Sequence, residues 1–194
     1  MTINVGITNY KGLALDSRTH FFGTPVVPKK LTKVKFEKEE VFVGQINFED
    51  VAPYDTENIL PKTGMLYIFF DTFAHIYTLY QFKEEGTFEL EGFNKKFETT
   101  GRFTAPMQLI FSVPVDEDDA RAYGTKLLAE IPQMVKDKYP KYANGYKALL
   151  IMCPRKLDYF EKQYLLNIDK YSVIAIKEKD LKRGKLTNVV TLNV

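Results

Sequence analysis

The sequence of 194 residues has no tryptophan, one cysteine and two histidines. Because Cys153 is the single thiol, no intramolecular disulfide can form, and we expect a reducing, cytoplasmic location. Long apolar runs are also missing, since the run MLYIFF has six residues, far below the roughly 20 needed to cross a bilayer. The N-terminal residues lack the basic and apolar regions of a signal peptide. We therefore predict neither secretion nor a membrane span.

Neither sign of charge dominates the composition. Lys and Arg number 27 and Asp and Glu number 25, which leaves a formal net charge of +2. This balance does not favour nucleic acid as a partner. Hydrophobic residues make up 45% and charged residues 27%, as in ordinary globular proteins. A chain of this length buries roughly 70% of its unfolded surface, so its core needs no structural metal.

The residue types that carry most enzyme chemistry are scarce. Metal or hydrolytic chemistry needs several His, Cys, Asp or Glu side chains close together, and His20 and His75 are far apart in the sequence. No glycine-rich phosphate loop or serine nucleophile elbow is present. Cys153 follows an apolar run and is interpreted as a buried structural residue rather than a nucleophile. We predict no catalytic residue, metal or cofactor.

What the sequence does contain is a series of short segments rich in Val, Ile, Phe, Tyr and Thr, bounded by Gly, Pro and Asn, which is typical of strands. They include TKVKFEK, EVFVGQINF, MLYIFFD, HIYTLYQF, MQLIFSVPV, YKALLIMC, SVIAIK and LTNVVTLNV. One segment, residues 116–137, has apolar residues at helical spacing, acidic residues at its start and lysines at its end. We predict a helix there, kinked or broken at Pro132.

Strands, one helix and then further strands predict an α+β fold, mainly antiparallel β-sheet with one main helix over 116–137. No long linker divides the chain, so we predict a single domain, 1–194, with an internal seam near 140–146. VGQIN at Val43–Asn47 and LLNID at Leu165–Asp169 are each followed by a strand-opening glycine. This echo indicates either two related β-rich halves or a chance recurrence.

Three segments carry a resemblance to a known family. HFFGTPVVP (20–28), FVGQINFEDVAP (42–53) and LPKTGMLYIFFD (60–71) occur in this order and spacing, and together they resemble the YwqG-like family of bacterial proteins. The chain departs from that pattern in lacking the Trp-Pro pair and in having Ile151–Pro154 in place of a Gly-Tyr-Pro element. The resemblance implies an intracellular α+β protein of unassigned role and supplies no catalytic residues.

The pentapeptide LPKTG, at Leu60–Gly64, also has the spelling of a bacterial wall-sorting motif. A sorting signal precedes a membrane-length apolar segment near the C-terminus, whereas here 130 further residues follow. Pro and Gly are suited to turn positions. We interpret the pentapeptide as a turn that leads directly into the strand beginning at Met65.

Four residues are candidates for binding a small ligand. Gln45 and Asn47 share one face of a strand, and a buried amide pair can orient a ligand. The alternative is that these amides hydrogen-bond neighbouring turns. Asp71 and His75 are four residues apart, and on one strand their Cα atoms would be about 13 Å apart. We consider Gln45, Asn47, Asp71 and His75 together as a ligand-binding hypothesis.

Two charged stretches have both a structural and a functional interpretation. The run DEDD at 116–119 fits the first turn of a helix better than a calcium loop. The stretch PKKLTKVKFEK could present Lys30, Lys33 and Lys35 to phosphates, but strand alternation places Phe36 toward the core and the lysines toward solvent. We favour the structural interpretation of both stretches.

The leading functional prediction is a non-enzymatic binding or protein-interaction module whose partner is another protein. It depends on ample fold signals combined with few residues of catalytic type. The alternative is a small-ligand-binding protein or an enzyme with a site between the two halves.

Overall fold

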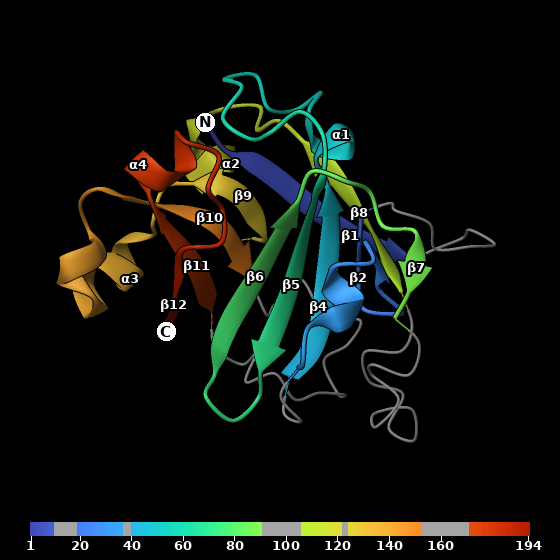
Figure 1. The fold of residues 1–194 in the computed structure, drawn as a ribbon. Coiled ribbons are helices and arrows are strands. Elements are labelled where there is room, and N and C mark those ends of the chain that lie inside the picture. The colour runs from blue at the N-terminus through green and yellow to red at the C-terminus, as the bar shows by residue number, and fades with distance from the viewer. Residues whose placement is uncertain (10–18, 37–39, 91–105, 122–123, 153–170) are drawn as a thin grey trace.

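The computed structural model describes residues 1–9, 19–36, 40–90, 106–121, 124–152 and 171–194. Strands dominate these residues (Figure 1). The strands are β1 (Ile3–Asn9), β2 (His20–Phe21), β3 (Val26–Val27), β4 (Glu40–Asn47), β5 (Met65–Asp71), β6 (Ile76–Phe82), β7 (Phe88–Glu89), β8 (Met107–Ser112), β9 (Lys126–Ala129), β10 (Tyr146–Met152), β11 (Ser172–Lys177) and β12 (Val189–Asn193). The helices are short: η1 (Leu31–Lys33), α1 (Phe48–Val51), α2 (Glu117–Arg121), α3 (Gln133–Lys138), η3 (Pro140–Tyr142) and α4 (Glu178–Leu181).

Ten strands form one antiparallel sheet in the order β12-β11-β10-β9-β1-β8-β2-β4-β5-β6. The sheet curls until its two edge strands, β6 and β12, lie side by side (Figure 1). The Tyr77 amide donates a hydrogen bond to Thr191 Oγ1 at 2.8 Å across this junction. Leu186, just before β12, donates its amide to Gln81 Oε1 at 3.0 Å. Side-chain hydrogen bonds thus link the two edges of the sheet.

The core fills the interior of this nearly closed sheet and continues onto its outer surface in two places. The inner cluster takes alternate residues of most strands, as in β8, where Met107, Leu109 and Phe111 are buried and the residues between them are exposed. A second cluster joins the outer surface of β10 and β11 to the segment around α3. A third cluster joins the outer surface of β4 and β5 to β3 and η1. Strands covered on both surfaces are therefore buried along nearly their whole length.

The predicted helix over 116–137 is wrong. Two short helices, α2 and α3, flank a strand, β9, whose four residues are all buried. Leu127 pairs with Ile3 of β1 and with Leu150 of β10, so this apolar run fills the gap between two strands. Pro132 lies directly before α3, where a missing amide hydrogen costs nothing. Sheet pairing outweighed the helical spacing of the apolar residues.

The predicted α+β class is consequently wrong as well. The described residues form a nearly closed, mostly antiparallel β-structure with minor helices, of which the longest, α3, has six residues. The antiparallel pairing itself was predicted correctly. The error came from one segment, since the four residues of β9 were assigned to a helix that does not form.

The order strand, one-turn helix, strand occurs twice, in β4-α1-β5 and in β11-α4-β12. The predicted second copy, Leu165–Asp169, lies outside the described residues, and the observed one begins at Ser172. Between the two occurrences, β10 pairs with β9 across the predicted seam at 140–146, and it pairs with β11 along its other edge. The sheet runs through this seam, so both occurrences belong to one sheet, and the relation between two halves stays a prediction.

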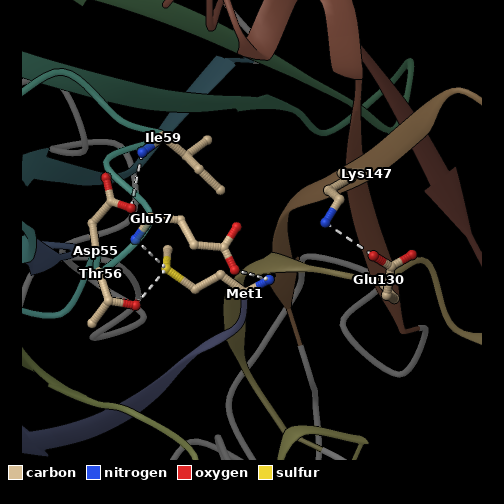
Figure 2. A network of polar contacts seen from close by, with 7 residues as sticks. All are labelled: Met1, Asp55, Thr56, Glu57, Ile59, Glu130 and Lys147. Atoms are coloured by element: carbon tan, nitrogen blue, oxygen red, sulfur yellow. Dashed lines mark hydrogen bonds and ion pairs between the residues drawn. The ribbon is translucent and has the colours of Figure 1, made fainter.

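The loop between α1 and β5 contains LPKTG and ends as predicted. Gly64 has a φ of +100°, which favours glycine, and β5 begins at the next residue. Deeper in the loop, the buried Asp55 carboxylate accepts the amides of Ile59 at 3.0 Å and Leu60 at 2.7 Å. Figure 2 shows the bond from the Ile59 amide to this carboxylate, and it also shows the Met1 ammonium group, which lies 3.1 Å from Glu57. The prediction of an ordered turn into a strand is confirmed.

The basic stretch before β4 is not the predicted strand. Residues 31–33 form η1 instead, with the Leu31 side chain fully buried. Phe36 does point toward the core, since its ring centroid lies 4.7 Å from that of Phe69 in the outer cluster on β4 and β5. The inward position of Phe36 was thus predicted correctly and the strand was not.

Candidate functional site

A group of polar side chains lies on the outer surface of β4 and β5, under the two-stranded sheet of β3 and β7. We call it the polar cluster, and its members are His20, Gln45, Asn47, Tyr67 and Glu85. Gln45 stands opposite His20 on one side and opposite Tyr67 on the other. The first four members are buried. Strand alternation therefore gathers here the two amides that the sequence placed on one face.

Two members of the polar cluster hold the backbone of Val26. Gln45 Oε1 accepts the Val26 amide at 2.9 Å, and the Tyr67 hydroxyl donates to the Val26 carbonyl at 2.7 Å. Both polar groups of one β3 residue are thereby satisfied by side chains of the large sheet. Such buried bonds stabilise the attachment of β3, because breaking one would leave a buried polar group without a hydrogen-bond partner.

Asn47 has a second structural role at the end of β4. Its Oδ1 accepts the Glu49 amide at 3.0 Å, which caps the N-terminus of α1. Its amide nitrogen donates to Glu85 Oε1 at 3.4 Å. Thr19 also accepts the Asn47 backbone amide through Oγ1 at 2.8 Å. Asn47 therefore holds the turn after β4, as the structural interpretation of the amides predicts, whereas Gln45 bonds a strand, β3.

Burial raises the pKa of Tyr67, and the nearby Glu85 carboxylate raises it further. Burial also raises the pKa of Tyr77, on the interior side of β6, although a hydrogen bond with Ser172 opposes the shift. Both rings are removed from water, so the neutral phenol is favoured over the phenolate.

We expect the protein to lose stability in alkali because of these two tyrosines. Each stabilising contribution is complete below the unfolded pKa of about 10 and is lost as the pH rises toward the higher folded pKa, at up to about 1.4 kcal/mol per pH unit for each ring. Urea unfolding between pH 8 and 11 would measure this, and Tyr77→Phe should reduce the slope. Ionisation of all 12 tyrosines of the native protein near pH 10 would contradict the expectation.

The other two predicted residues shape the turn between β5 and β6. Asp71 Oδ1 accepts the amides of Phe73 and Ala74, both at 2.8 Å, and the Asp71 carbonyl accepts the His75 amide at 2.9 Å. His75 has a φ of +56°, and its carbonyl accepts a hydrogen bond from Asn193 Nδ2 at 3.1 Å. Together these contacts order a turn whose most exposed large apolar side chain, Phe73, is 85% exposed. We call residues 71–76 the hairpin tip.

The structure brings the predicted residues together in pairs and keeps the pairs apart. Along the β4–β5 ladder, Asp71 stands opposite Glu40, whereas Asn47 stands opposite Met65 at the other end. Six residues of strand separate these positions, which corresponds to about 20 Å. The polar cluster and the hairpin tip are two locations, and ligand binding by these four residues stays a prediction.

The remaining candidates have clear positions or lie beyond the description. His20 is buried, with its ring centroid 5.9 Å from that of Phe42. Residues 117–119 form the first turn of α2, as predicted for the acidic run. Cys153 lies outside the described residues. Within the described ranges, no group of three or more His, Cys, Asp or Glu side chains has the proximity that a metal ion requires. No described helix has the length and apolar character of a membrane span.

Sequence reasoning missed the most exposed part of the hairpin tip. Phe73 lies between the segments MLYIFFD and HIYTLYQF and was not considered, because strand patterns do not tell whether a loop aromatic folds back onto the core. The available signal was Asp71 followed by a small four-residue turn, since an aspartate at a strand end commonly bonds the amides that follow it.

The polar cluster and the hairpin tip both fall within the part of the chain that defines its family. A family profile matches residues 19–123, which include strands β2 to β8. The chain belongs to the family described as a domain of unknown function, DUF1963. No curated protein shows significant similarity to the chain.

Proposed function

We propose that this DUF1963 protein is a non-enzymatic protein-interaction module that binds a protein partner through the hairpin tip. The observation that carries the proposal is the 85% exposure of Phe73 on a turn ordered by hydrogen bonds. Ile76, the first residue of β6 and the last of the hairpin tip, is 49% exposed. An aromatic side chain has two side-chain torsions, and on an ordered backbone it loses little conformational entropy when a partner covers it.

Several contacts keep the hairpin tip in place. The Asp71 carboxylate fixes the turn from within, and Asn193 holds the His75 carbonyl from β12. The Phe70 and Tyr77 rings, with centroids 4.7 Å apart, pack at its base. Exposed aromatic anchors on rigid supports are common among the residues that dominate binding energy at interfaces. Asp71 and His75, two of the four residues predicted as a ligand site, are therefore proposed to position an anchor.

Photocrosslinking in the native host tests this proposal. A photoreactive amino acid at position 73 should give a discrete protein adduct, and the same amino acid at Val115, which is 88% exposed, should not. With the captured partner in purified form, Phe73→Ser should weaken binding about thirtyfold, as for a hot-spot residue. Val115→Ser is the matched control and should bind like the wild type. Equal adducts at both positions, or unchanged binding by Phe73→Ser, would refute the proposal.

The wider setting is part of the same proposal. We infer a cytoplasmic protein of the YwqG-like type in bacteria, supported by the sequence resemblance and the single cysteine. We also infer that residues 1–194 act as one domain, supported by the continuity of the ten-stranded sheet. One cooperative unfolding transition is expected on that basis.

A further inference from the structure

The near-neutral composition conceals an uneven distribution of charge. Residues 130–147 and 177–185 together hold nine cationic and four anionic residues, a formal net charge of +5. The rest of the chain holds 18 cationic and 21 anionic residues, a formal net charge of −3. We call the surface of these two segments the basic face. The net charge of the chain does not reveal the basic face, because the negative charge of the remaining residues offsets most of its positive charge.

The two segments of the basic face are adjacent in space. Tyr146 at the start of β10 pairs with Lys177 at the end of β11. The first amide of α4, from Glu178, donates to the Gly145 carbonyl at 3.0 Å. In Figure 1, α3 and α4 lie on the same side of the molecule, at the left of the view. The cations are therefore combined on one side instead of being spread around the sheet.

Internal contacts use several of the anions on this face. Glu130 lies 3.0 Å from the half-buried Lys147, as Figure 2 shows. Asp180 is buried and accepts a hydrogen bond from Asn188 at 3.0 Å. Asp137 accepts a hydrogen bond from Gln133 at 2.7 Å. Because the Glu130–Lys147 pair removes one charge of each sign, the formal excess of five positive charges remains, and exposed lysines such as Lys141, Lys179 and Lys182 carry part of it.

The basic face adjoins the hairpin tip. Lys138, in the last turn of α3, donates through Nζ to the Asn193 carbonyl at 3.0 Å. The same Asn193 donates its side-chain amide to His75 in the hairpin tip. The Tyr139 hydroxyl also donates to the Asn193 carbonyl, at 2.9 Å. The α3 end of the basic face therefore lies next to the hairpin tip that carries Phe73.

We propose that the protein partner that docks on the hairpin tip is acidic and that the basic face steers and orients it. This inference rests on the proposed function and names the chemistry of the partner. Opposite charges across an interface raise the association rate and fix the orientation of the partner.

Two observations favour an acidic protein over nucleic acid. Eight of the nine cations are lysines and one is Arg183, whereas arginine is the residue that binds phosphate in a bidentate manner. The tyrosines of this face are half-buried and pack on one another and on the cluster over β10 and β11, as in the edge contact of Tyr142 and Tyr146 with centroids 5.0 Å apart. Lys141 covers the Tyr142 ring at 4.7 Å. Such rings offer little flat surface on which bases could stack.

Binding of fluorescently labelled poly-L-glutamate to the full chain tests the inference. The wild type should bind it, and binding should fall steeply as the salt concentration rises. The triple variant K141E/K179E/K182E should bind about tenfold or more weakly. The control K29E/K33E/K35E makes the same change in net charge at exposed lysines elsewhere and should bind like the wild type. Equal losses in both variants would overturn the inference, because net charge would then suffice.

Two further measurements complete the test. Tighter binding of single-stranded oligo-dT than of poly-L-glutamate at the same salt concentration would overturn the inference in favour of nucleic acid. Crosslinking from position 73 in the K141E/K179E/K182E background should give a reduced yield of the wild-type adduct, and an undiminished yield would overturn the inference while the proposed function stands. If position 73 gives no adduct in the wild type, the proposed function fails and the poly-L-glutamate result still decides whether the basic face selects acidic chains.

Discussion

Replacement of Gly86 by alanine is expected to lower the free energy of unfolding by about 3 kcal/mol. Gly86 lies just before β7, where its Cα faces the backbone of β3. A Cβ atom there would overlap the carbonyl group of Val26 and approach the Val27 nitrogen to 2.7 Å. Backbone atoms cannot rotate away as a flexible side chain can, so β3 and β7 would have to separate.

The separation would also disturb neighbouring bonds. The Val26 carbonyl is the group that accepts the Tyr67 hydroxyl, and the Val27 carbonyl accepts the Thr87 amide at 3.1 Å. A shift of β3 would strain both contacts and expose the outer cluster on β4 and β5. Backbone atoms surround this site, so the structure can adjust little to an added methyl group. The expected loss of stability is therefore at the upper end of the range for overpacking substitutions.

Urea unfolding monitored by tyrosine fluorescence would measure the effect. Gly6→Ala is the matched control, because a Cβ at Gly6 would meet Ile110 at ordinary contact distances of 3.7 and 3.8 Å. The control should stay within about 0.5 kcal/mol of the wild type. Equal stabilities of the Gly86→Ala and Gly6→Ala variants would show that the contact between β7 and β3 is wrongly described.

Replacement of Asp55 by alanine is the second large expected effect, and it should also lower the free energy of unfolding by about 3 kcal/mol. The buried carboxylate accepts two backbone amides, from Ile59 and Leu60, in the loop that precedes β5. Hydrogen bonds to charged groups contribute about 1.5 to 3 kcal/mol, and a buried amide left without its acceptor adds a desolvation cost. Leu60, which is buried in the inner cluster, would lose its fixed position.

Asp71→Ala provides the comparison for Asp55→Ala. Asp71 also accepts two backbone amides, but these bonds are exposed, so water can replace the carboxylate. Asp71→Ala should therefore lower the free energy of unfolding by about 1 kcal/mol. Thermal or urea unfolding of both variants would separate the contribution of burial from the number of bonds. A smaller effect at Asp55 than at Asp71 would contradict the described geometry of the loop.

The local patterns of the sequence predicted much of the β-structure. MQLIFS alternates between buried and exposed residues in the structure, as a strand with one covered face must. Gly64 and the turn before Met65 followed from the special conformations that Gly and Pro adopt. These features depend on a residue and its near neighbours, and such short-range information is contained in the sequence.

Residues 126–129 show where local information failed. Lys-Leu-Leu-Ala fits a helical face as well as a strand buried on both surfaces. The choice depended on β1 and β10, which pair with this segment from more than a hundred residues before it and about twenty after it. A single sequence does not show which segments will meet, so the helix was preferred on spacing alone.

The candidate site divides in the same way. Period-two alternation placed Gln45 and Asn47 on one face, and the structure confirms that they share the surface under β3. Long-range pairing decided three other features. The amides anchor backbone, Asp71 fixes a turn that exposes Phe73, and the cations of two segments form one face.

The sequence by itself determined most of the strand-forming segments, the turn at Leu60–Gly64 and the small number of histidines and cysteines, because each follows from composition or short-range stereochemistry. Only the tertiary structure decided the closure of the sheet, the strand at 126–129 and the meeting of the hairpin tip with the basic face. Those features arise when distant segments compete to cover the same apolar surface and to satisfy the same backbone groups, and the pairing that buries most is selected for the whole chain at once.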